Sequence, residues 1–556
     1  MNATALPDAQ LYAAAVARSK TRWPRPQLGT ETLILLSSLY FTAISNFAFW
    51  HAAVPEPAQQ WRLAMALFLV VTGLHAFLLG LVAGRWTIKP LLTVLVLVTA
   101  LASHYMSAYG VFLDADMIRN VLHTDSRESS ELMTFGMLLP VLLALVPVAL
   151  LWHIRIRART WPRAFGIRLG FLAAMLAVVG TGAFMSYQDL SSLMRNHREM
   201  RYLVTPVNYL VSLGTVLLSS PPGPKAALLP IGEDAVQATR PAGSKPRLLV
   251  VVVGETARAQ NWGLNGYARQ TTPELAKVDG LVNFSQMRAC GSSTEVSLPC
   301  MFSAFGRANY SESDNRTHQG LLHVLDHAGI QTLWRDNQSG CKGVCDGLTT
   351  QRLADSANPA LCNGKRCLDE ILISDLQAQL DPSKGDKVVV LHQLGNHGPS
   401  YFERYPLEFQ RFTPTCQSPE LGECEQQQIV NAYDNALLYT DHFLARTIEL
   451  LKSEQRFDTG LIYVSDHGES LGEKGLYLHG VPYAIAPQEQ LHVPMVMWFS
   501  PAFIVNAGLD AECLRSRAAQ PASHDNLFPS ILGLLQVKTR EYRAAGDLFA
   551  GCRKPA

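Results

Sequence analysis

The first half of the chain contains no cysteine, and all ten cysteines of the 556-residue sequence lie between Cys290 and Cys552. Charged residues are also scarce, since Asp, Glu, Lys and Arg make up only 17% of the chain, and mean hydropathy is positive. Both values are unusual for a soluble enzyme, and the length is too great for one domain. A formal net charge of +1 without any basic run argues against nucleic acid as a partner.

The cysteines that are present form closely spaced pairs. These pairs are 290/300, 341/345, 362/367 and 416/424, with Cys513 and Cys552 left over. Such spacing predicts local disulfides in an oxidising compartment, which places the second half of the chain outside the cytoplasm. A zinc site built from the four cysteines of the second and third pairs is the alternative interpretation, because both spacings are short.

Five apolar runs before residue 190 are long enough to span a bilayer, at 33–50, 61–83, 90–109, 133–152 and 169–187. No small-residue cleavage site follows the first run, so we expect an uncleaved membrane helix there. Lys and Arg gather in alternate loops, at 85–89 and 155–168. Because basic residues are retained on the cytoplasmic side, the N-terminus is predicted to lie inside and everything after residue 187 outside.

The chain is thereby divided into four predicted segments. Residues 1–30 form a cytoplasmic N-terminus, 31–188 an α-helical five-span transmembrane domain, 189–246 a bridging helix and linker, and 247–556 a domain outside the cytoplasm. Basic and aromatic residues mix between 194 and 203. This mixture indicates either an amphipathic helix on the outer membrane surface or an extension of the last membrane helix.

The last segment alternates short apolar runs with helix-length stretches. The runs lie at 248–253, 387–391, 460–464 and 493–499, and helices are expected at 320–328 and 427–451. This alternation predicts an α/β domain with a largely parallel sheet. Ligands of such sheets bind beyond the carboxyl ends of the strands.

Hydroxyl side chains gather between the two cysteines of the first pair. A helix is expected from residue 294 to 305, so the Thr294 hydroxyl would stand at a helix N-terminus. Backbone N–H groups and the helix dipole favour the negative charge of a phosphoryl group there. We therefore predict that Thr294 is a nucleophile. The alternative is that Ser292, Ser293 and Thr294 only cap the helix.

Acidic and imidazole groups follow three of the expected strands. Glu255 comes just after the first strand, His392 and His397 follow the second, and Asp466 and His467 come just after the third. Carboxylates at one sheet edge repel each other unless a positive charge neutralises them, and two carboxylates with one imidazole suit zinc. The open position would go to Thr294, whose hydroxyl then loses its proton more readily and attacks phosphorus. The alternative interpretation treats each element alone. Glu255 is then a helix cap, and Asp466 and His467 form an ion pair within a loop.

Three further residues lie in expected loops of the same domain: Lys342, His397 and His479. We expect them to contact phosphate, or the histidines to hold a second metal. A solvent-exposed surface position is the alternative for Lys342.

Four motifs together resemble a known family. They are Val-Gly-Glu-Thr-Ala-Arg at 253–258, Cys-Gly-Ser-Ser-Thr-Glu-Val-Ser-Leu-Pro-Cys-Met-Phe-Ser at 290–303, Gly-Asn-His-Gly-Pro at 395–399 and Ser-Asp-His-Gly-Glu at 465–469. With its membrane helices, the chain is similar over nearly its whole length to the lipid A phosphoethanolamine transferases of Gram-negative bacteria. These enzymes give polymyxin resistance and belong to the alkaline-phosphatase-like and sulfatase-like superfamily.

The resemblance implies roles for individual residues. The implied ligands of one or two zinc ions are Glu255, Thr294, Asp466 and His467. The implied substrate-binding positions are Lys342, His397 and His479. Thr294 would also carry phosphoethanolamine during the reaction. Some members have Asn where this chain has Gln338, so no substrate role is assigned to Gln338.

The implied reaction has two steps, in which Thr294 takes phosphoethanolamine from phosphatidylethanolamine and passes it to a phosphate of lipid A. The chain is expected to act as a monomer in the bacterial inner membrane, with its catalytic domain in the periplasm, where both lipids are within reach. The alternatives are transfer to a lipopolysaccharide core sugar or another envelope glycan, glycerol-phosphate transfer, a periplasmic hydrolase, and a membrane-anchored metal-binding sensor.

Overall fold

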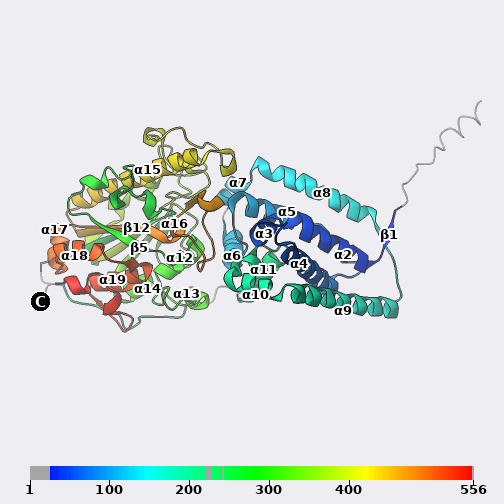
Figure 1. The fold of residues 1–556 in the computed structure, drawn as a ribbon. Coiled ribbons are helices and arrows are strands. Elements are labelled where there is room, and N and C mark those ends of the chain that lie inside the picture. The colour runs from blue at the N-terminus through cyan, green and yellow to red at the C-terminus, as the bar shows by residue number, and fades with distance from the viewer. Residues whose placement is uncertain (1–24, 125, 220–226, 241–242, 554–556) are drawn as a thin grey trace, which may run out of the picture. The chain divides into compact units, whose positions relative to one another are not determined.

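The computed structural model describes residues 25–124, 126–219, 227–240 and 243–553 (Figure 1). Most of the predicted cytoplasmic segment at 1–30, and parts of the predicted linker, lie outside the described residues. Contacts between residues divide the chain into two compact units. One holds the described residues up to Leu101 together with Leu139–Asn196, and the other holds Ala102–Leu138 together with the described residues from His197 onward.

The N-terminal part of the described chain is built from apolar helices. Four stretches are long and apolar enough to cross a membrane: α4 (Trp61–Val82), α5 (Ile88–Tyr109), η2 with α8 (Phe135–His153) and α9 (Trp161–Met185). A fifth crossing is present if the bent pair Thr30–Ser45 and Phe47–Ala53, whose halves meet at 64°, is one span. Apolar helices are thus confirmed where they were predicted, while the number of five spans stays a prediction.

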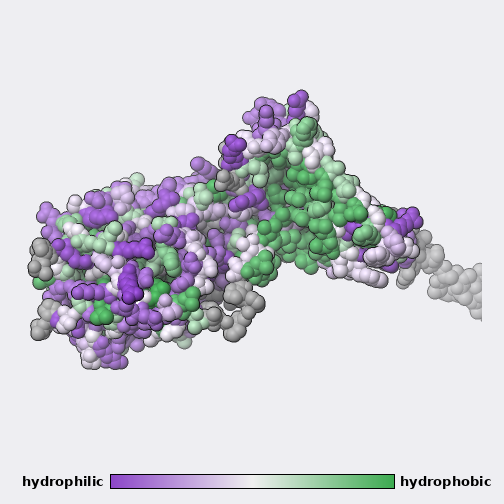
Figure 2. Space-filling model, turned by 90° about the horizontal axis from the view of Figure 1, so that it is seen from below, coloured by the Kyte–Doolittle hydropathy of each residue, from purple (hydrophilic) through white to green (hydrophobic). Residues whose placement is uncertain are grey.

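Glycines allow α4 and α9 to pack closely within the first unit. A Cβ atom added at Gly73 would lie 2.8 Å from Val179 Cγ2, and one at Gly182 would lie 2.9 Å from the Ala66 carbonyl oxygen. Small residues at helix contacts are typical of membrane bundles, where they let backbones approach. Figure 2 shows a broad hydrophobic surface on the helical part of the chain and a mostly polar surface on the C-terminal domain.

The second unit contains an eight-stranded sheet with the strand order β13-β5-β12-β9-β4-β8-β6-β7. The strands are β4 (Arg247–Gly254), β5 (Val282–Arg288), β6 (Gln331–Asp336), β7 (Thr350–Arg352), β8 (Lys387–His392), β9 (Asp458–Ser465), β12 (His492–Phe499) and β13 (Ala522–Ser523). Only β12 runs antiparallel to its neighbours, β5 and β9. The prediction of an α/β domain with a largely parallel sheet is confirmed.

Helices cover both faces of this sheet. They include α12 (Thr294–Met301), α14 (Leu321–His327), α15 (Gln426–Ser453), α16 (Gln488–Leu491), α18 (Ala511–Ala518) and α19 (Leu527–Leu534). In β4, Val251 packs into the core shared with α12, α14 and α19, while its neighbour Val250 packs into the core shared with α15. Alternate residues of a central parallel strand are therefore buried on opposite faces, which explains its continuous apolar run.

The segment between α5 and α8 packs against the sheet domain. It forms α6 (Ala115–His123) and α7 (Ser126–Leu132). Arg404 Nη2 donates to Glu131 Oε2 at 2.7 Å, and Arg119 Nη2 lies 2.5 Å from Glu312 Oε1. The predicted bridging region holds α10 (Tyr187–Asn196), the short 3-10 helix η3 (Arg198–Tyr202) and α11 (Val207–Ser219). Residues 194–203 thus do not form one continuous helix.

The four predicted cysteine pairs form disulfides, and the two leftover cysteines form a fifth. They are Cys290–Cys300, Cys341–Cys345, Cys362–Cys367, Cys416–Cys424 and Cys513–Cys552. The alternative of a zinc site at Cys341, Cys345, Cys362 and Cys367 is wrong, because each of these sulfurs is bonded to another sulfur.

Candidate active site

Two neighbouring strands deliver the predicted acidic residues to one edge of the sheet. β4 and β9 are parallel, and Gly254 lies opposite Ser465 in their register. Glu255 and Asp466 therefore leave the sheet at the same level, and the Asp466 N–H donates to the Gly254 carbonyl oxygen at 2.9 Å. The expectation that strand ends bring these groups together is confirmed.

Thr294 begins helix α12 and points its hydroxyl at this edge. Its Oγ1 lies 3.1 Å and 3.2 Å from the two Glu255 carboxylate oxygens and 3.2 Å from His467 Nε2. His467 Nδ1 lies 2.9 Å from the Gly468 carbonyl oxygen, to which it can only donate. Nε2 is therefore the ring nitrogen left for the cluster. Ser297, one turn further along α12, donates to the Asp466 carbonyl oxygen at 2.5 Å and ties the helix to β9.

The cluster favours a positive charge at its centre. Burial raises the pKa of Glu255, but His467 and the other nearby histidines outweigh this effect and hold it below its usual range. Burial and the Glu255 charge raise the pKa of Asp466. Burial lowers the pKa of His467, yet the Asp466 and Glu255 carboxylates outweigh it and raise that pKa to about 10. A cation at the centre of the cluster therefore stabilises the two buried carboxylates.

The same residues fit a metal ion. One ligand atom each from Glu255, Asp466 and His467 lies within 4.8 Å of the others. Among the described residues, Asp466 Oδ2 is a buried oxygen without a hydrogen-bond partner, although His467 Nε2 is 3.5 Å away. An unpartnered buried carboxylate oxygen is costly unless a cation binds it. Carboxylates and an imidazole with a neighbouring hydroxyl form a donor set that suits zinc.

The two predicted substrate histidines lie beside His467. The ring of His479 is 4.4 Å from the His467 ring, and the ring of His397 is 5.5 Å from that of His479, between centroids. His479 Nδ1 lies 2.9 Å from Glu469 Oε2. Glu469, His467 and His479 form a second group that fits a metal ion. Glu469 was not singled out from the sequence, although it ends the Ser-Asp-His-Gly-Glu motif.

Lys342 lies next to helix α12, which begins at Thr294. Its side chain is only 8% exposed, and its Nζ lies 3.8 Å from Oε2 of Glu295, the residue after Thr294. The alternative of a solvent-exposed surface position for Lys342 is therefore wrong. Glu295 also accepts hydrogen bonds at 2.7 Å from Arg316, and its Oε1 lies 2.7 Å from His123 Nδ1.

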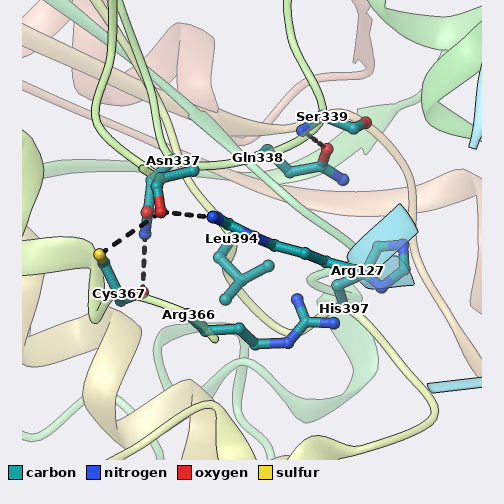
Figure 3. A pocket seen from close by; sticks show the side chains of 9 residues that line it. Arg127, Asn337, Gln338, Ser339, Arg366, Cys367, Leu394 and His397 are labelled. Atoms are coloured by element: carbon teal, nitrogen blue, oxygen red, sulfur yellow. Dashed lines mark hydrogen bonds between the residues drawn. The ribbon is translucent and has the colours of Figure 1, made fainter. Parts of the chain in front are cut away.

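Gln338, to which no role was assigned, contacts the cluster directly. Its Nε2 donates to Glu255 Oε2 at 3.1 Å. It also lines a small cavity of about 30 Å³, together with Arg127, Ser339, Arg366 and His397. Figure 3 shows Gln338 and Ser339 on one side of this cavity and Arg366 on the other. Arg127 comes from α7, so the segment between two apolar helices contributes to the wall of this cavity.

Two further buried histidines lie beside the cluster. His392 Nδ1 lies 2.7 Å from Asp336 Oδ1, and its Nε2 is 4.0 Å from Glu255 Oε2. His524 Nε2 lies 3.0 Å from the Ser465 carbonyl oxygen, while its Nδ1 accepts from the Cys290 N–H at 3.1 Å. Burial lowers the pKa of His524 to about 3, so this imidazole is neutral. It joins the end of β9 to the loop before Thr294.

Comparison with known proteins agrees with this geometry. The Sulfatase family model matches residues 247–537, so the fold and the site define a sulfatase-like domain. Residues 71–220 match the family model described as Phosphoethanolamine transferase EptA/EptB.

Relatives extend the similarity to nearly the whole chain. Phosphoethanolamine transferase EptA of Salmonella typhimurium is 39% identical over 540 residues, which cover 95% of this chain and 98% of that protein. Phosphatidylethanolamine transferase Mcr-1 of Escherichia coli is 36% identical, over 93% and 96%. The structure of the integral membrane lipooligosaccharide phosphoethanolamine transferase EptA of Neisseria meningitidis matches with a TM-score of 0.90 and 38% identity, over 95% of this chain and 100% of that chain. The chain therefore belongs to the EptA family of phosphoethanolamine transferases and is a transferase enzyme.

Proposed function

We propose that this protein transfers phosphoethanolamine from phosphatidylethanolamine to a phosphate of lipid A, with Thr294 as the carrier. The observation that carries the proposal is the position of the Thr294 hydroxyl, buried and within 3.2 Å of both Glu255 and His467. A hydroxyl at the first turn of a helix, beside a group of metal-binding side chains, is well placed to bond to phosphorus.

The first step uses the lipid donor. Thr294 Oγ1 bonds to phosphorus, the bond between phosphorus and the glycerol oxygen breaks, and diacylglycerol leaves carrying a proton in place of the one that Thr294 lost. In the second step an oxygen of the acceptor phosphate bonds to phosphorus, the bond between phosphorus and Thr294 Oγ1 breaks, and Thr294 recovers its hydroxyl with the proton that the acceptor lost. Lys342, His397 and His479 contact the phosphoryl oxygens in both steps, which positions the phosphorus opposite Thr294.

We propose zinc as the cofactor. Glu255, Thr294, Asp466 and His467 would hold one ion, and His479 with Glu469 would help to hold a second. When bound, zinc lowers the pKa of a coordinated hydroxyl and neutralises charge on phosphoryl oxygens.

The proposed location is the bacterial inner membrane, with the catalytic domain in the periplasm and the chain acting as a monomer. The apolar helices and the five disulfides support this arrangement. Adding an ethanolamine cation reduces the negative charge of lipid A, so cationic peptides such as polymyxin bind less well.

Mass spectrometry of lipid A tests the proposal. Cells that produce the intact chain should gain phosphoethanolamine on lipid A, and Thr294→Ala should lower the gain by about a thousandfold or more, as expected for loss of a nucleophile. Ser293→Ala is the matched control, because the Ser293 side chain makes no capping hydrogen bond. Modification of a core sugar instead of lipid A would move the assignment to the alternative acceptor. An active Thr294→Ala enzyme would contradict the proposed carrier.

A further inference from the structure

A second, larger hollow lies outside the cluster described above. It is a groove of about 500 Å³, a size within the range of small-molecule sites. Seven of the side chains that line it are polar or basic: Gln286, Arg288, Gln488, His492, Arg517, Ser523 and Asn526. We infer that this groove binds the anionic, phosphorylated sugar head group of the acceptor, and this inference rests on the function proposed above.

The groove is positively charged. No carboxylate is among the described residues that line it. Arg288 Nε donates to the Tyr483 hydroxyl at 3.0 Å, and Arg517 Nη1 donates to the Pro521 carbonyl oxygen at 3.3 Å. Both partners are neutral, so two guanidinium charges are left for a ligand. Arginine is the side chain best suited to phosphate and carboxylate groups.

The groove lies at the same edge of the sheet as the catalytic cluster. Arg288 ends β5, and its partners in register are His492 on β12 and Ser523 on β13. β12 runs antiparallel to β9, with Met495 opposite Val464. Its first residue, His492, therefore stands towards the end at which β9 leads into Asp466 and His467. Ligands of such sheets bind at this edge.

The walls of the groove belong to the loops that hold the reactive residues. Tyr483, which accepts from Arg288, lies in the loop whose Val481 carbonyl oxygen accepts from Ser292 Oγ at 2.6 Å. The Gly468 N–H, next to His467, donates to the Gln490 carbonyl oxygen of α16 at 2.9 Å. Arg288 precedes Thr294 by six residues, so their Cα atoms are at most about 20 Å apart. A ligand seated here is held by the framework that positions Thr294.

The rest of the lining suits a sugar. The Gln286 and Asn526 amides already donate to the Ala519 and Gly546 carbonyl oxygens at 2.8 Å. The Gln488 amide and the Ser523 hydroxyl can both donate and accept hydrogen bonds, as sugar hydroxyls require. Ala522 and Pro521 add an apolar surface for the ring face. A diacyl lipid with a small ethanolamine head group offers few partners for such a lining, so the acceptor is the better occupant.

The test uses the full chain in detergent micelles with Arg288→Gln and Arg517→Gln, singly and combined. Two quantities are measured: diacylglycerol release from phosphatidylethanolamine without acceptor, and the rate of transfer as lipid A concentration rises. We expect the double variant to raise the KM for lipid A about tenfold, while kcat and diacylglycerol release stay within twofold of the intact chain. Arg446→Gln is the matched control, because Arg446 pairs with Glu449 on the exposed surface of α15, and it should change neither quantity.

An unchanged KM for lipid A in the double variant would overturn the inference. A parallel fall in diacylglycerol release would also overturn it, because the groove would then serve the donor or the fold. A direct binding measurement keeps the inference separate from the proposed function. Isothermal titration with deacylated lipid A, a phosphorylated glucosamine disaccharide, should show binding to the intact chain and a loss of about tenfold in the double variant. If the intact chain binds this probe but transfers nothing to lipid A, the proposed function is wrong. The inference that the groove binds a phosphorylated sugar is then still supported.

Discussion

His123 Nδ1 lies 2.7 Å from Oε1 of Glu295, and this contact joins α6 to the helix that carries Thr294. Glu295 is buried, and Arg316 and Lys342 approach the same carboxylate. Burial by itself raises the pKa of the Glu295 carboxyl group. The basic groups of His123, Arg316 and Lys342 outweigh this effect and hold that pKa below its usual range. The residue after Thr294 thus contacts three basic side chains from separate parts of the chain.

This contact predicts a measurable coupling between His123 and Glu295. A double-mutant cycle of His123→Ala and Glu295→Gln should give an interaction free energy of about 0.5–1 kcal/mol in urea unfolding of the full chain. The value is modest because the His123 side chain is 52% exposed. Additive effects of the two substitutions would mean that the contact contributes nothing to stability.

The Cys290–Cys300 disulfide is expected to matter for transfer, beyond its effect on stability. Replacing both cysteines by serine should lower the free energy of unfolding by roughly 3 kcal/mol and also lower the transfer rate, because the loop before Thr294 gains freedom. Replacing Cys513 and Cys552, whose bridge closes 39 residues, should cost roughly 4 kcal/mol and leave transfer intact below the melting temperature. Equal losses of activity in the two variants would count against a positioning role.

Metal removal should weaken the fold as well as the activity. Zinc at a hundred times its dissociation constant should stabilise the chelator-treated chain by about 2.7 kcal/mol, which thermal unfolding would detect. Asp466→Asn should abolish this response because it removes a carboxylate from the cluster. Asp234→Asn, at an exposed ion pair with Arg540, should keep it. A full zinc response in Asp466→Asn would disprove the assigned ligand.

His524 should make stability fall with acid. Its pKa is lowered by burial to about 3 in the folded chain, against about 6.5 in an unfolded one. The contribution of His524 to the free energy of unfolding is therefore fully present above pH 6.5 and is lost as the pH falls towards 3. The loss reaches about 2 kcal/mol at pH 5. Urea unfolding at pH 8 and pH 5 should show this loss in the intact chain, and His524→Gln should lack that part of it. The same pH dependence in both proteins would refute the assignment.

The sequence predicted the central strands and the approach of Glu255, Asp466 and His467 because both rest on local signals. The sequence shows continuous apolar runs at four strands that are buried on both faces: β4, β8, β9 and β12. The register of β4 and β9 then brings Glu255 and Asp466 to the same level at the edge of the sheet. β5 was missed because it is half exposed and its apolar residues alternate with polar ones. That alternation is itself a strand signal. Helix α12 ends at Met301, four residues before the predicted end.

The contacts around the cluster could not be predicted from the sequence, because they join residues that are far apart along the chain. Gln338 meets Glu255 across 83 residues of sequence, and His123 meets Glu295 across 172. No local pattern encodes such pairs, because they exist only once the strands and loops have assembled. Motif spacing indicates where a strand ends, but not which distant side chain will face it.

The packing of the α6–α7 segment against the sheet domain has a consequence for biosynthesis. Glu131 of α7 accepts a hydrogen bond from Arg404, 273 residues later in the chain. At 5–20 residues per second, the ribosome needs roughly 15–60 s to make the residues between them. The segment is therefore made long before its partner exists. The cavity that Arg127 of α7 lines with Gln338 and His397 is thus completed late, after most of the chain has been translated.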